Sequence, residues 1–225
     1  IIPARGGSKR IPKKNIKHFL GKPIIAYTIE NAINSKLFDE VMVSTDDDDI
    51  AKIAISYGAK VPFIRSGKNA NDFATTIDVI KEVILSYENL GRKFEYASCI
   101  YPCTPLLSKE RLEESFYLLE ENNLDCVFPV IKYGFPIQRS VRLNDKGLLE
   151  MLQPEHLITR SQDLEPSFHD AGQFYSFNVN NLISKQKLLT DLTGHIEVSE
   201  MEAQDIDNLV DWKLAELKYK MLNNL

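Results

Sequence analysis

The stretch EVMVSTDDDDIAKIAISYGAKVPFI, residues 40–64, contains a complete strand–helix–strand unit. Its first six residues are apolar enough to form a buried strand. Residues 47–57 then have helical spacing and end before Gly58, a residue suited to a helix C-cap. The segment KVPFI at 60–64 predicts a second, shorter strand, and its Pro62 favours a place near a sheet edge. This order of elements predicts parallel strands joined by a helix.

Strands and helices alternate along most of the chain. A strand end is expected at residues 1–4 (IIPA), and further strands at 96–101 and 125–131. Helical spacing predicts three more helices, whose inward faces are Ile25, Ile29, Ala32 and Ile33; Ile77, Ile80, Ile84 and Tyr87; and Leu112, Phe116 and Leu119. Pro23 suits the start of the first of these helices, and Ser108 suits the N-cap of the third. The pattern predicts an α/β fold, a mostly parallel sheet with helices on both faces and ligands at the carboxyl ends of its strands.

The regular alternation stops near residue 133 and resumes at AGQFYSFNV, residues 171–179. Between them lie turn signals and short alternating stretches, which predict a small β-rich insertion or arm over 133–170. The whole chain, 1–225, is expected to form a single domain around it. A final helix is predicted after DIDN at 205–208. Its spacing predicts an inward face of Val210, Leu214, Leu217 and Met221.

Composition narrows the class of protein. The formal net charge of −5 argues against broad binding to nucleic acids. No apolar run approaches the roughly 20 residues needed to cross a bilayer, and no signal peptide is visible, so a cytoplasmic protein is expected. Cys99, Cys103 and Cys126 are odd in number and irregularly spaced, which indicates buried thiols in a reducing compartment. Because the chain opens on Ile1 without an initiator Met, we expect a few residues to precede it.

The first loop, PARGGSKRIPKKN at residues 3–15, concentrates positive charge in an acidic protein. Its cations are Arg5, Lys9, Arg10, Lys13 and Lys14. The Gly6-Gly7 pair lets backbone N–H groups approach an anion closely, and the loop follows a strand at the expected ligand edge. Neither the Walker spacing nor the G-x-G-x-x-G fingerprint is present. The loop favours a triphosphate held partly by side chains, and the alternative is a solvated basic loop.

Acidic residues mark two further candidate positions. Asp205 and Asp207 lie two apart, so in an extended segment both would face one side and offer oxygen ligands to Mg²⁺. The alternative is an acidic start to the last helix. In VSTDDDDI, residues 43–50, Asp46 is nearest the strand end and has the best claim to a site role, near a metal or a sugar. Helix entry remains the alternative, and the later aspartates suit an N-cap.

Taken together, these segments resemble the cytidylyltransferases that activate nonulosonic acids, the family of the sialic acid and 3-deoxy-manno-octulosonate activating enzymes. IPARGGSKRIPKKN looks like the family's N-terminal nucleotide-binding motif. VSTDDDDIA, FATTIDVI, YPCTPLL and QDIDN match further blocks in the same order. The resemblance spans nearly the whole chain. It implies a Rossmann-like nucleotide-diphospho-sugar transferase fold.

One branch of the family fits best. YPCTP and RSQDLEPSFHDAGQFY are similar to the pseudaminic acid enzymes of bacteria. Sialic acid enzymes usually have Gln where Tyr101 stands and Asn-Gly near Ala171-Gly172, whereas the pseudaminate branch commonly has Trp where this chain has Ser176. The resemblance implies transfer of CMP from CTP to the anomeric hydroxyl of a nine-carbon acidic sugar, with release of pyrophosphate. Alternatives are neuraminic, legionaminic or 3-deoxy-manno-octulosonic acid, another nucleotide, or a catalytically silent nucleotide-binding protein of this fold.

The resemblance also implies roles for individual residues. Arg5 would place the α-phosphate, and Lys9 and Lys14 would neutralise the phosphates that leave. Asp205 and the catalytic Asp207 would hold Mg²⁺, or Mn²⁺ in its place. The implied nucleotide-binding positions are Ala4, Arg5, Gly6, Gly7, Ser8, Lys9, Asn15, Asp46, Arg65, Ala74, Thr75 and Thr76, of which Arg65 and 74–76 would read the cytosine. Arg10, where the family often has Gly, and Lys13 are expected to face solvent.

The implied sugar-binding positions are Tyr101, Arg160, His169, Gln173 and Tyr175, with Arg160 or Arg139 as the cation for the sugar carboxylate. For most of the implied site residues, an ordinary structural role is the alternative. The tyrosines and the histidine could be structural, Arg65 could be a surface ion-pairing residue, and the threonines could cap a helix. The irregular region resembles the family's dimerisation arm, so a homodimer is expected. A local lid would produce a similar pattern.

Overall fold

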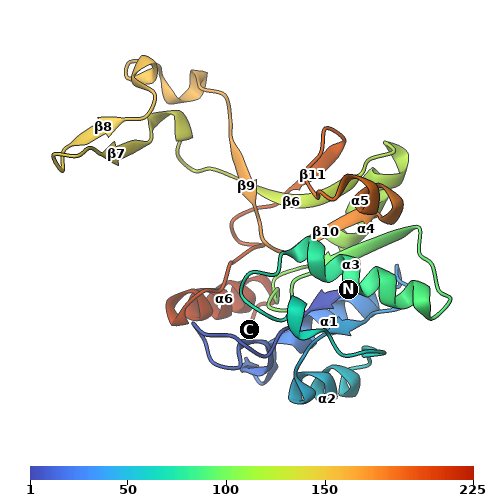
Figure 1. Ribbon diagram of the computed structural model, residues 1–225. Helices are drawn as coiled ribbons and strands as arrows, with labels where there is room; N and C mark the ends of the chain where they lie inside the picture. Colours follow the sequence, from blue (N-terminus) through green and yellow to red (C-terminus); the bar gives the residue numbers. More distant parts are fainter.

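The computed structural model describes residues 1–225 and contains one main sheet with helices packed on it (Figure 1). Its strands, in spatial order, are β4 (Val43–Ser44), β1 (Ile2–Pro3), β5 (Tyr96–Ile100), β10 (Phe174–Asn178), β6 (Cys126–Lys132) and β11 (Thr193–Glu197). β1 joins β5 through Ile1, whose amino group donates to the Ser98 carbonyl at 2.7 Å. The Ile100 N–H donates back to the Ile1 carbonyl at 2.9 Å, which completes a parallel ladder.

Most strands of this sheet run in one direction. β10 alone is antiparallel to both of its neighbours, β5 and β6, whereas β1 pairs parallel with β4 and β11 pairs parallel with β6. The predicted mostly parallel sheet is therefore confirmed. The predicted strand at 60–64 is not formed, because only Lys60 bridges to Met42 beside β4. Pro62 has no N–H to donate to a longer ladder.

Helices cover both faces of the sheet. They are α1 (Ile24–Asn34), α2 (Asp48–Ser56), α3 (Thr76–Asn89), α4 (Lys109–Glu121), α5 (Val179–Lys185) and α6 (Leu209–Leu222). Adjacent strand residues point to opposite sides: Ile100 and Val127 belong to the core with α1, α2 and α4, and Cys99 and Cys126 belong to the core with α3 and α5. No helix combines the length and apolarity needed to cross a membrane.

A second, smaller core joins the first loop to the last helix. A hairpin of β2 (His18–Phe19) and β3 (Lys22–Pro23) follows a 3₁₀ turn at Lys14–Ile16. The Phe19 ring lies 5.6 Å from the Trp212 ring of α6, and Ile11 and Ile206 are buried around them. This core brings the residues before α6 next to the amino-terminal loop.

The predicted inward face of the last helix is wrong. Val210 and Met221 are 75% and 68% exposed, and Leu214 and Leu217 are exposed as well. α6 instead buries Trp212 and Ala215 against the aromatic hairpin. The large indole and its edge-on aromatic contacts outweigh the longer aliphatic stripe.

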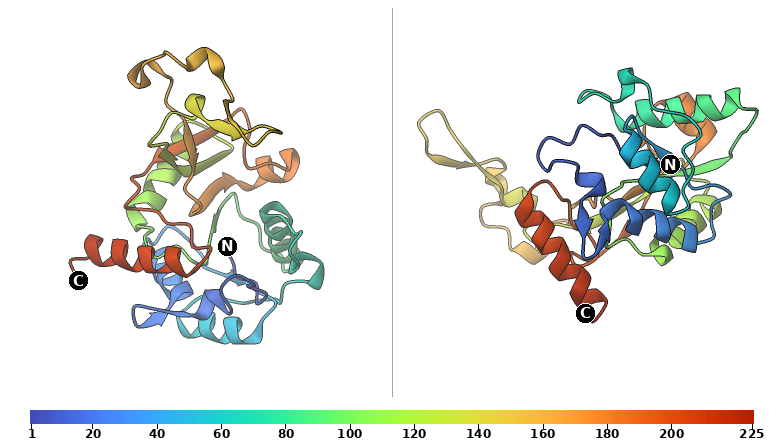
Figure 2. Two further views of the ribbon diagram at one scale, coloured as in Figure 1. Left: turned by 90° about the vertical axis from the view of Figure 1, so that its left-hand side faces the viewer. Right: turned by 90° about the horizontal axis from the view of Figure 1, so that it is seen from below.

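Residues between β6 and β9 (Phe168–Asp170) leave the body as a projecting arm (Figures 1 and 2). The arm contains a hairpin of β7 (Val141–Leu143) and β8 (Leu149–Met151). It also contains short 3₁₀ turns at Ile137–Arg139, Pro154–His156 and Ser161–Asp163. One further 3₁₀ turn, at Gly67–Asn69, lies in the body before α3. No residue from 132 to 170 is buried, and Phe135 and Ile158 are about nine-tenths exposed. The arm coincides with the region where the sequence loses its alternation.

Candidate active site

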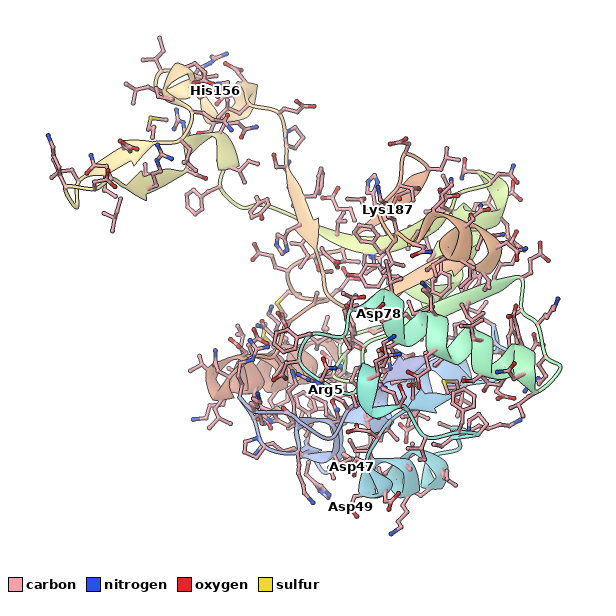
Figure 3. All side chains as sticks on the ribbon, in the orientation of Figure 1. Arg5, Asp47, Asp49, Asp78, His156 and Lys187 are labelled. Carbon is pink, nitrogen blue, oxygen red and sulfur yellow. The ribbon has the colours of Figure 1, made fainter.

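The basic loop lines a polar cavity at the carboxyl end of β1. The cavity measures about 370 Å³ and is lined by Pro3, Arg5, Ser8, Lys9, Arg10, Lys14, Asn15, Asp72 and Pro102. Figure 3 marks Arg5 at this edge of the molecule, on the side where α2 and α3 begin. The structure therefore gathers four of the predicted nucleotide-binding residues, Arg5, Ser8, Lys9 and Asn15, together with the predicted catalytic Lys14. Arg10 was expected to face solvent, but its side chain also lines the cavity.

The backbone of the loop is held by its neighbours. The Gly6 N–H donates to Asp46 Oδ1 at 2.9 Å, and Asn15 Nδ2 donates to the Arg5 carbonyl at 2.9 Å. A Cβ on Gly6 would lie 2.7 Å from Asp47 Oδ2, so only glycine fits this approach. The Asp46 and Asn15 side chains thus hold the backbone of the first loop in place. The resemblance implied instead that both residues contact the nucleotide. Asp47, as predicted for the later aspartates, caps α2 by accepting from Asp49 N at 2.8 Å.

Other predicted donors of the loop are already engaged. The Ala4 N–H donates to the Ser44 carbonyl at 2.9 Å within the sheet, so it is not available to a phosphate. The Ser8 hydroxyl donates to the Ile11 carbonyl at 2.6 Å. Gly7, by contrast, is exposed and has open space beside it. Side-chain cations are therefore the main anion-binding groups of the cavity.

The late carboxylates lie beside the first loop, as predicted. Lys14 Nζ donates to the Ile206 carbonyl at 2.7 Å, and Arg10 forms an ion pair with Asp207. Ile206 is buried, which turns Asp205 and Asp207 outward on either side of it. Asn208, with Asp211, caps α6, so the alternative of an acidic helix start does not account for Asp207.

The segment before these carboxylates is anchored from α6. Lys218 Nζ donates to the carbonyls of Glu200 and Ala203 at 2.6 and 2.9 Å and to Gln204 Oε1 at 2.9 Å. The sequence analysis missed Lys218, because a lysine on a helix is ordinarily a solvated surface residue. It also missed Asp72, an isolated acidic residue in an irregular loop.

The predicted cytosine-reading positions lie at the start of α3. Thr75 forms the capping box with Asp78, so the capping alternative is correct for this residue, and its N–H is engaged by the Asp78 carboxylate at 3.0 Å. The Thr76 hydroxyl lies 3.1 Å from the Tyr101 hydroxyl. The Ala74 N–H donates to Asn71 Oδ1 at 3.0 Å. Backbone recognition of a base at 74 and 75 would require these bonds to open.

Arg65 is not a surface ion-pairing residue. It is 6% exposed, and its Nε donates to Ser44 Oγ at 2.9 Å. Burial lowers the pKa of its guanidinium, and the nearby Asp46 carboxylate opposes that shift. Its Nη1 makes no hydrogen bond within the chain, so one charged donor of this residue is unpaired.

Aromatic residues form the next part of this edge. The Tyr101 and Tyr175 rings meet edge to face at 5.9 Å, and the Tyr175 hydroxyl donates to Asp170 at the root of the arm. Burial raises the pKa of Tyr175, and its bond to Asp170 raises it further. His169 is exposed, and its Nδ1 lies 3.0 Å from the Asp170 carbonyl. Gln173 is 3% exposed and donates to the Glu202 carbonyl at 2.6 Å, so it holds the late segment and is not free for a sugar.

The arginines expected at the sugar carboxylate are not at the cavity of their own chain. Arg160 lies in the arm and pairs with Asp163 at 2.7 Å. Arg139 also lies there and donates to the Thr159 carbonyl. His156, labelled in Figure 3, shows how far this part of the arm stands from Arg5. The single chain therefore does not bring either arginine to the predicted sugar site.

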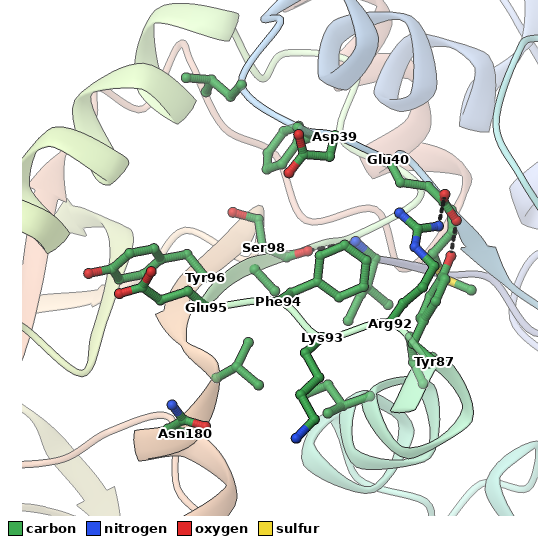
Figure 4. A pocket seen from close by; sticks show the side chains of 18 of the residues that line it. Asp39, Glu40, Tyr87, Arg92, Lys93, Phe94, Glu95, Tyr96, Ser98 and Asn180 are labelled. Carbon is green, nitrogen blue, oxygen red and sulfur yellow. Dashed lines mark hydrogen bonds and ion pairs between the residues drawn. The ribbon is translucent and has the colours of Figure 1, made fainter. Parts of the chain in front are cut away.

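Another cavity, about 490 Å³ in volume, lies elsewhere in the molecule (Figure 4). It surrounds Ile1 at the amino ends of the strands, opposite the edge where such sheets bind ligands. Glu40 lines this cavity and connects three segments of the chain, because its carboxylate accepts hydrogen bonds from Lys60, Tyr87 and Arg92; we call this group the Glu40 clamp. Burial alone would raise the pKa of Glu40, but hydrogen bonds from Tyr87, Arg92 and Lys60 outweigh burial and lower that pKa to about 2. The Glu40 carboxylate is thus fully engaged by Tyr87, Arg92 and Lys60 and is not free to bind a ligand in this cavity.

Comparison with known proteins shows the family of this chain. A family model described as cytidylyltransferase matches residues 1–223. The chain is 38% identical to a pseudaminic acid cytidylyltransferase of Campylobacter jejuni, over 98% of this chain and 95% of that protein. It is 29% identical to the CMP-N,N'-diacetyllegionaminic acid synthase of Legionella pneumophila, over 96% and 93% of the two chains.

A solved structure shares the fold. A CMP:2-keto-3-deoxy-manno-octonic acid synthetase in complex with CTP matches with a TM-score of 0.71 at 18% identity, over 100% of this chain and 98% of that chain. The predicted nucleotidyltransferase fold is thereby confirmed. From the family model and the full-length relatives, the chain belongs to the cytidylyltransferase family of nucleotidyltransferases.

Proposed function

We propose that this protein transfers CMP from CTP to the anomeric hydroxyl of pseudaminic acid and releases pyrophosphate. The observation that carries the proposal is the contact of the 205–207 segment with Arg10 and Lys14, two of the cations that line the cavity. The full-length pseudaminic acid relatives support the choice of sugar. Because CTP is a cytoplasmic nucleotide, the reaction is assigned to the cytoplasm.

The cavity suits a reaction driven by positioning and charge neutralisation. A hydroxyl must approach the α-phosphorus in line with the leaving pyrophosphate, and negative charge grows on that leaving group. Arg5 would orient the α-phosphate, and Lys9 and Lys14 would hold the phosphates that leave. Cations positioned at the phosphates stabilise the charge that develops on the leaving group.

The late carboxylates fit a divalent metal ion. Asp205 and Asp207 present hard oxygen ligands on one accessible side of their segment, and no third carboxylate, His or Cys joins them. Mg²⁺ in nucleotide sites is typically held by one or two carboxylates together with substrate phosphates and water. Mg²⁺, or Mn²⁺ in its place, would neutralise phosphate charge and lower the pKa of the incoming hydroxyl. The chain itself holds the carboxylates in place, through Lys14 and Lys218.

The sugar would lie across the strand ends, against Tyr101 and Tyr175 and within reach of His169. Its carboxylate needs a cation that this chain does not place there, which is consistent with a contribution from a second subunit. The arm exposes Phe135, Leu149 and Ile158 without any core of its own. In a homodimer, burial of these side chains on the partner would stabilise the arm and could carry Arg160 to the partner's sugar site.

The proposal is tested by pyrophosphate release with CTP and Mg²⁺ against a panel of purified acids. The panel contains pseudaminic, legionaminic, neuraminic and 3-deoxy-manno-octulosonic acids, with UTP and GTP as alternative nucleotides. We expect the highest kcat/KM with CTP and pseudaminic acid. A higher value with another acid would reassign the sugar, and turnover with UTP would reassign the base. CTP binding without pyrophosphate release from any acid would indicate a silent binding protein.

A further inference from the structure

Asp72 faces the cations of the first loop from another wall of the cavity. It lies between the 3₁₀ turn at Gly67–Asn69 and α3, and its side chain is 41% exposed. Its Oδ1 accepts from Arg5 Nη1 at 2.7 Å, and its Oδ2 accepts from Lys9. One carboxylate therefore engages two of the cations that the proposed reaction assigns to phosphates.

The charges of the cavity show what a phosphate would meet. Arg10 already pairs with Asp207, and Lys14 already donates to a carbonyl. The bonds from Lys9 and Arg5 lower the pKa of Asp72, so its carboxylate stays ionised around neutral pH. An anionic ligand that binds these donors of Arg5 and Lys9 competes with Asp72 for them. Exposed ion pairs of this kind are weak, so a multiply charged phosphate group can compete successfully.

We propose that Asp72 is the resident counter-anion of the triphosphate subsite: it holds Arg5 and Lys9 in the cavity until the phosphates of the nucleotide replace it. The inference rests on the proposed function, since it takes CTP as the ligand. Asp72 is then a positioning residue that acts through the two cations. When pyrophosphate has formed, the same carboxylate competes for them again and favours product release.

The exchange has a second consequence for the loop that carries Asp72. Asn71 Oδ1 accepts from the N–H groups of Phe73 and Ala74, at 2.7 and 3.0 Å, and so fixes the approach to α3. Release of Asp72 removes the contact that ties this loop to the first loop. Arrival of the triphosphate is thereby coupled to the segment at 74–76, where the cytosine would be read.

The test is calorimetric binding of CTP, inorganic pyrophosphate and cytidine to the wild-type protein and to Asp72→Asn, without metal or sugar. The substitution keeps the shape of the side chain and removes its charge. We expect Asp72→Asn to bind CTP and pyrophosphate about twofold to thirtyfold more tightly, the range expected when two exposed ion pairs no longer compete. Cytidine, which carries no phosphate, should bind equally to both proteins.

Matched variants separate this effect from a general change in charge. Asp49→Asn removes a carboxylate that pairs with Lys13 of the same loop at 3.1 Å, outside the cavity, and should leave all three affinities unchanged. Asp72→Glu restores a carboxylate and should restore the wild-type affinities. Equal or weaker CTP binding by Asp72→Asn would overturn the inference and leave the proposed function standing. Absence of CTP binding by the wild-type protein, both without metal and with Mg²⁺ added, would instead refute the proposed function.

Discussion

Replacement of Lys14 by Met gives a direct test of the cation cavity. Lys14 Nζ donates to the Ile206 carbonyl at 2.7 Å across the junction of the first loop and the late segment. A charge-assisted hydrogen bond of a partly buried group stabilises a fold by about 1 kcal/mol, which corresponds to a loss of about 2–4 °C in Tm for a chain of this size. Met keeps the aliphatic stem and removes only the ammonium group.

The catalytic loss should be larger than the loss of stability. A preorganised group that stabilises developing charge is worth about 2–4 kcal/mol in the transition state, or about 30-fold to 1000-fold in kcat/KM. The control is Lys13→Met, which removes the neighbouring cation of the same loop. Lys13 pairs with Asp49 at 3.1 Å and does not line the cavity, so its loss should change kcat/KM by less than threefold.

The assays are initial rates of pyrophosphate release at varied CTP and thermal unfolding of the same preparations. If Lys14→Met lowered the Tm as expected but kept kcat/KM within threefold of the wild type, Lys14 would be a structural tether only. If both lysine variants lost activity equally, a diffuse positive field would replace the specific cavity as the explanation. Either result would refute the reasoning from this geometry.

Three further outcomes are expected. Asp207→Asn should abolish turnover while Tm and circular dichroism stay near the wild-type values, because its side chain is partly exposed and contacts only Arg10; near-normal rates would remove it from the metal site. The folded-state pKa of Glu40, about 2, lies below its ordinary value of 4.5, so its contribution to stability is present above about pH 4.5 and is lost as the pH falls toward 2. Urea midpoints of Glu40→Gln should therefore change less between pH 5 and pH 2.5 than those of the wild type, and an equal change would contradict the clamp. If the protein forms the proposed homodimer, Ile158→Asp, at a position 91% exposed in the arm, should convert it to a monomer in light scattering, whereas Leu189→Asp, 70% exposed on the body, should not.

Local patterns correctly predicted that the basic loop lies at the carboxyl end of β1. The turn after β1 contains the glycines and cations within a dozen residues, so sequence spacing alone placed them on one loop. Asp47 and Thr75 became helix caps because capping depends on a residue and its next three neighbours. The extended course of 205–207 also followed from an alternating pattern with Ile206 inside.

Roles that depend on distant partners were predicted less well. Gln173 and Asn15 look like ligand-binding amides in the sequence, yet the Glu202 and Arg5 carbonyls accept from their side chains. Arg160 resembles a carboxylate-binding cation, but the arm carries it away from the cavity of its own chain. Such outcomes depend on which backbone group comes within hydrogen-bond distance, and spacing along the chain does not contain that information.

The sequence by itself determined that strands and helices alternate, that a basic turn follows the first strand, and that two late aspartates share one side of their segment. These features are local, because strand and helix periodicity and turn chemistry act over a few residues. Only the tertiary structure decided that Asp72 pairs with Arg5 and Lys9, that Arg10 meets Asp207, and that α6 buries Trp212 and not its aliphatic stripe. Those choices depend on packing and charge between segments up to 197 positions apart, where the fold alone sets the distance.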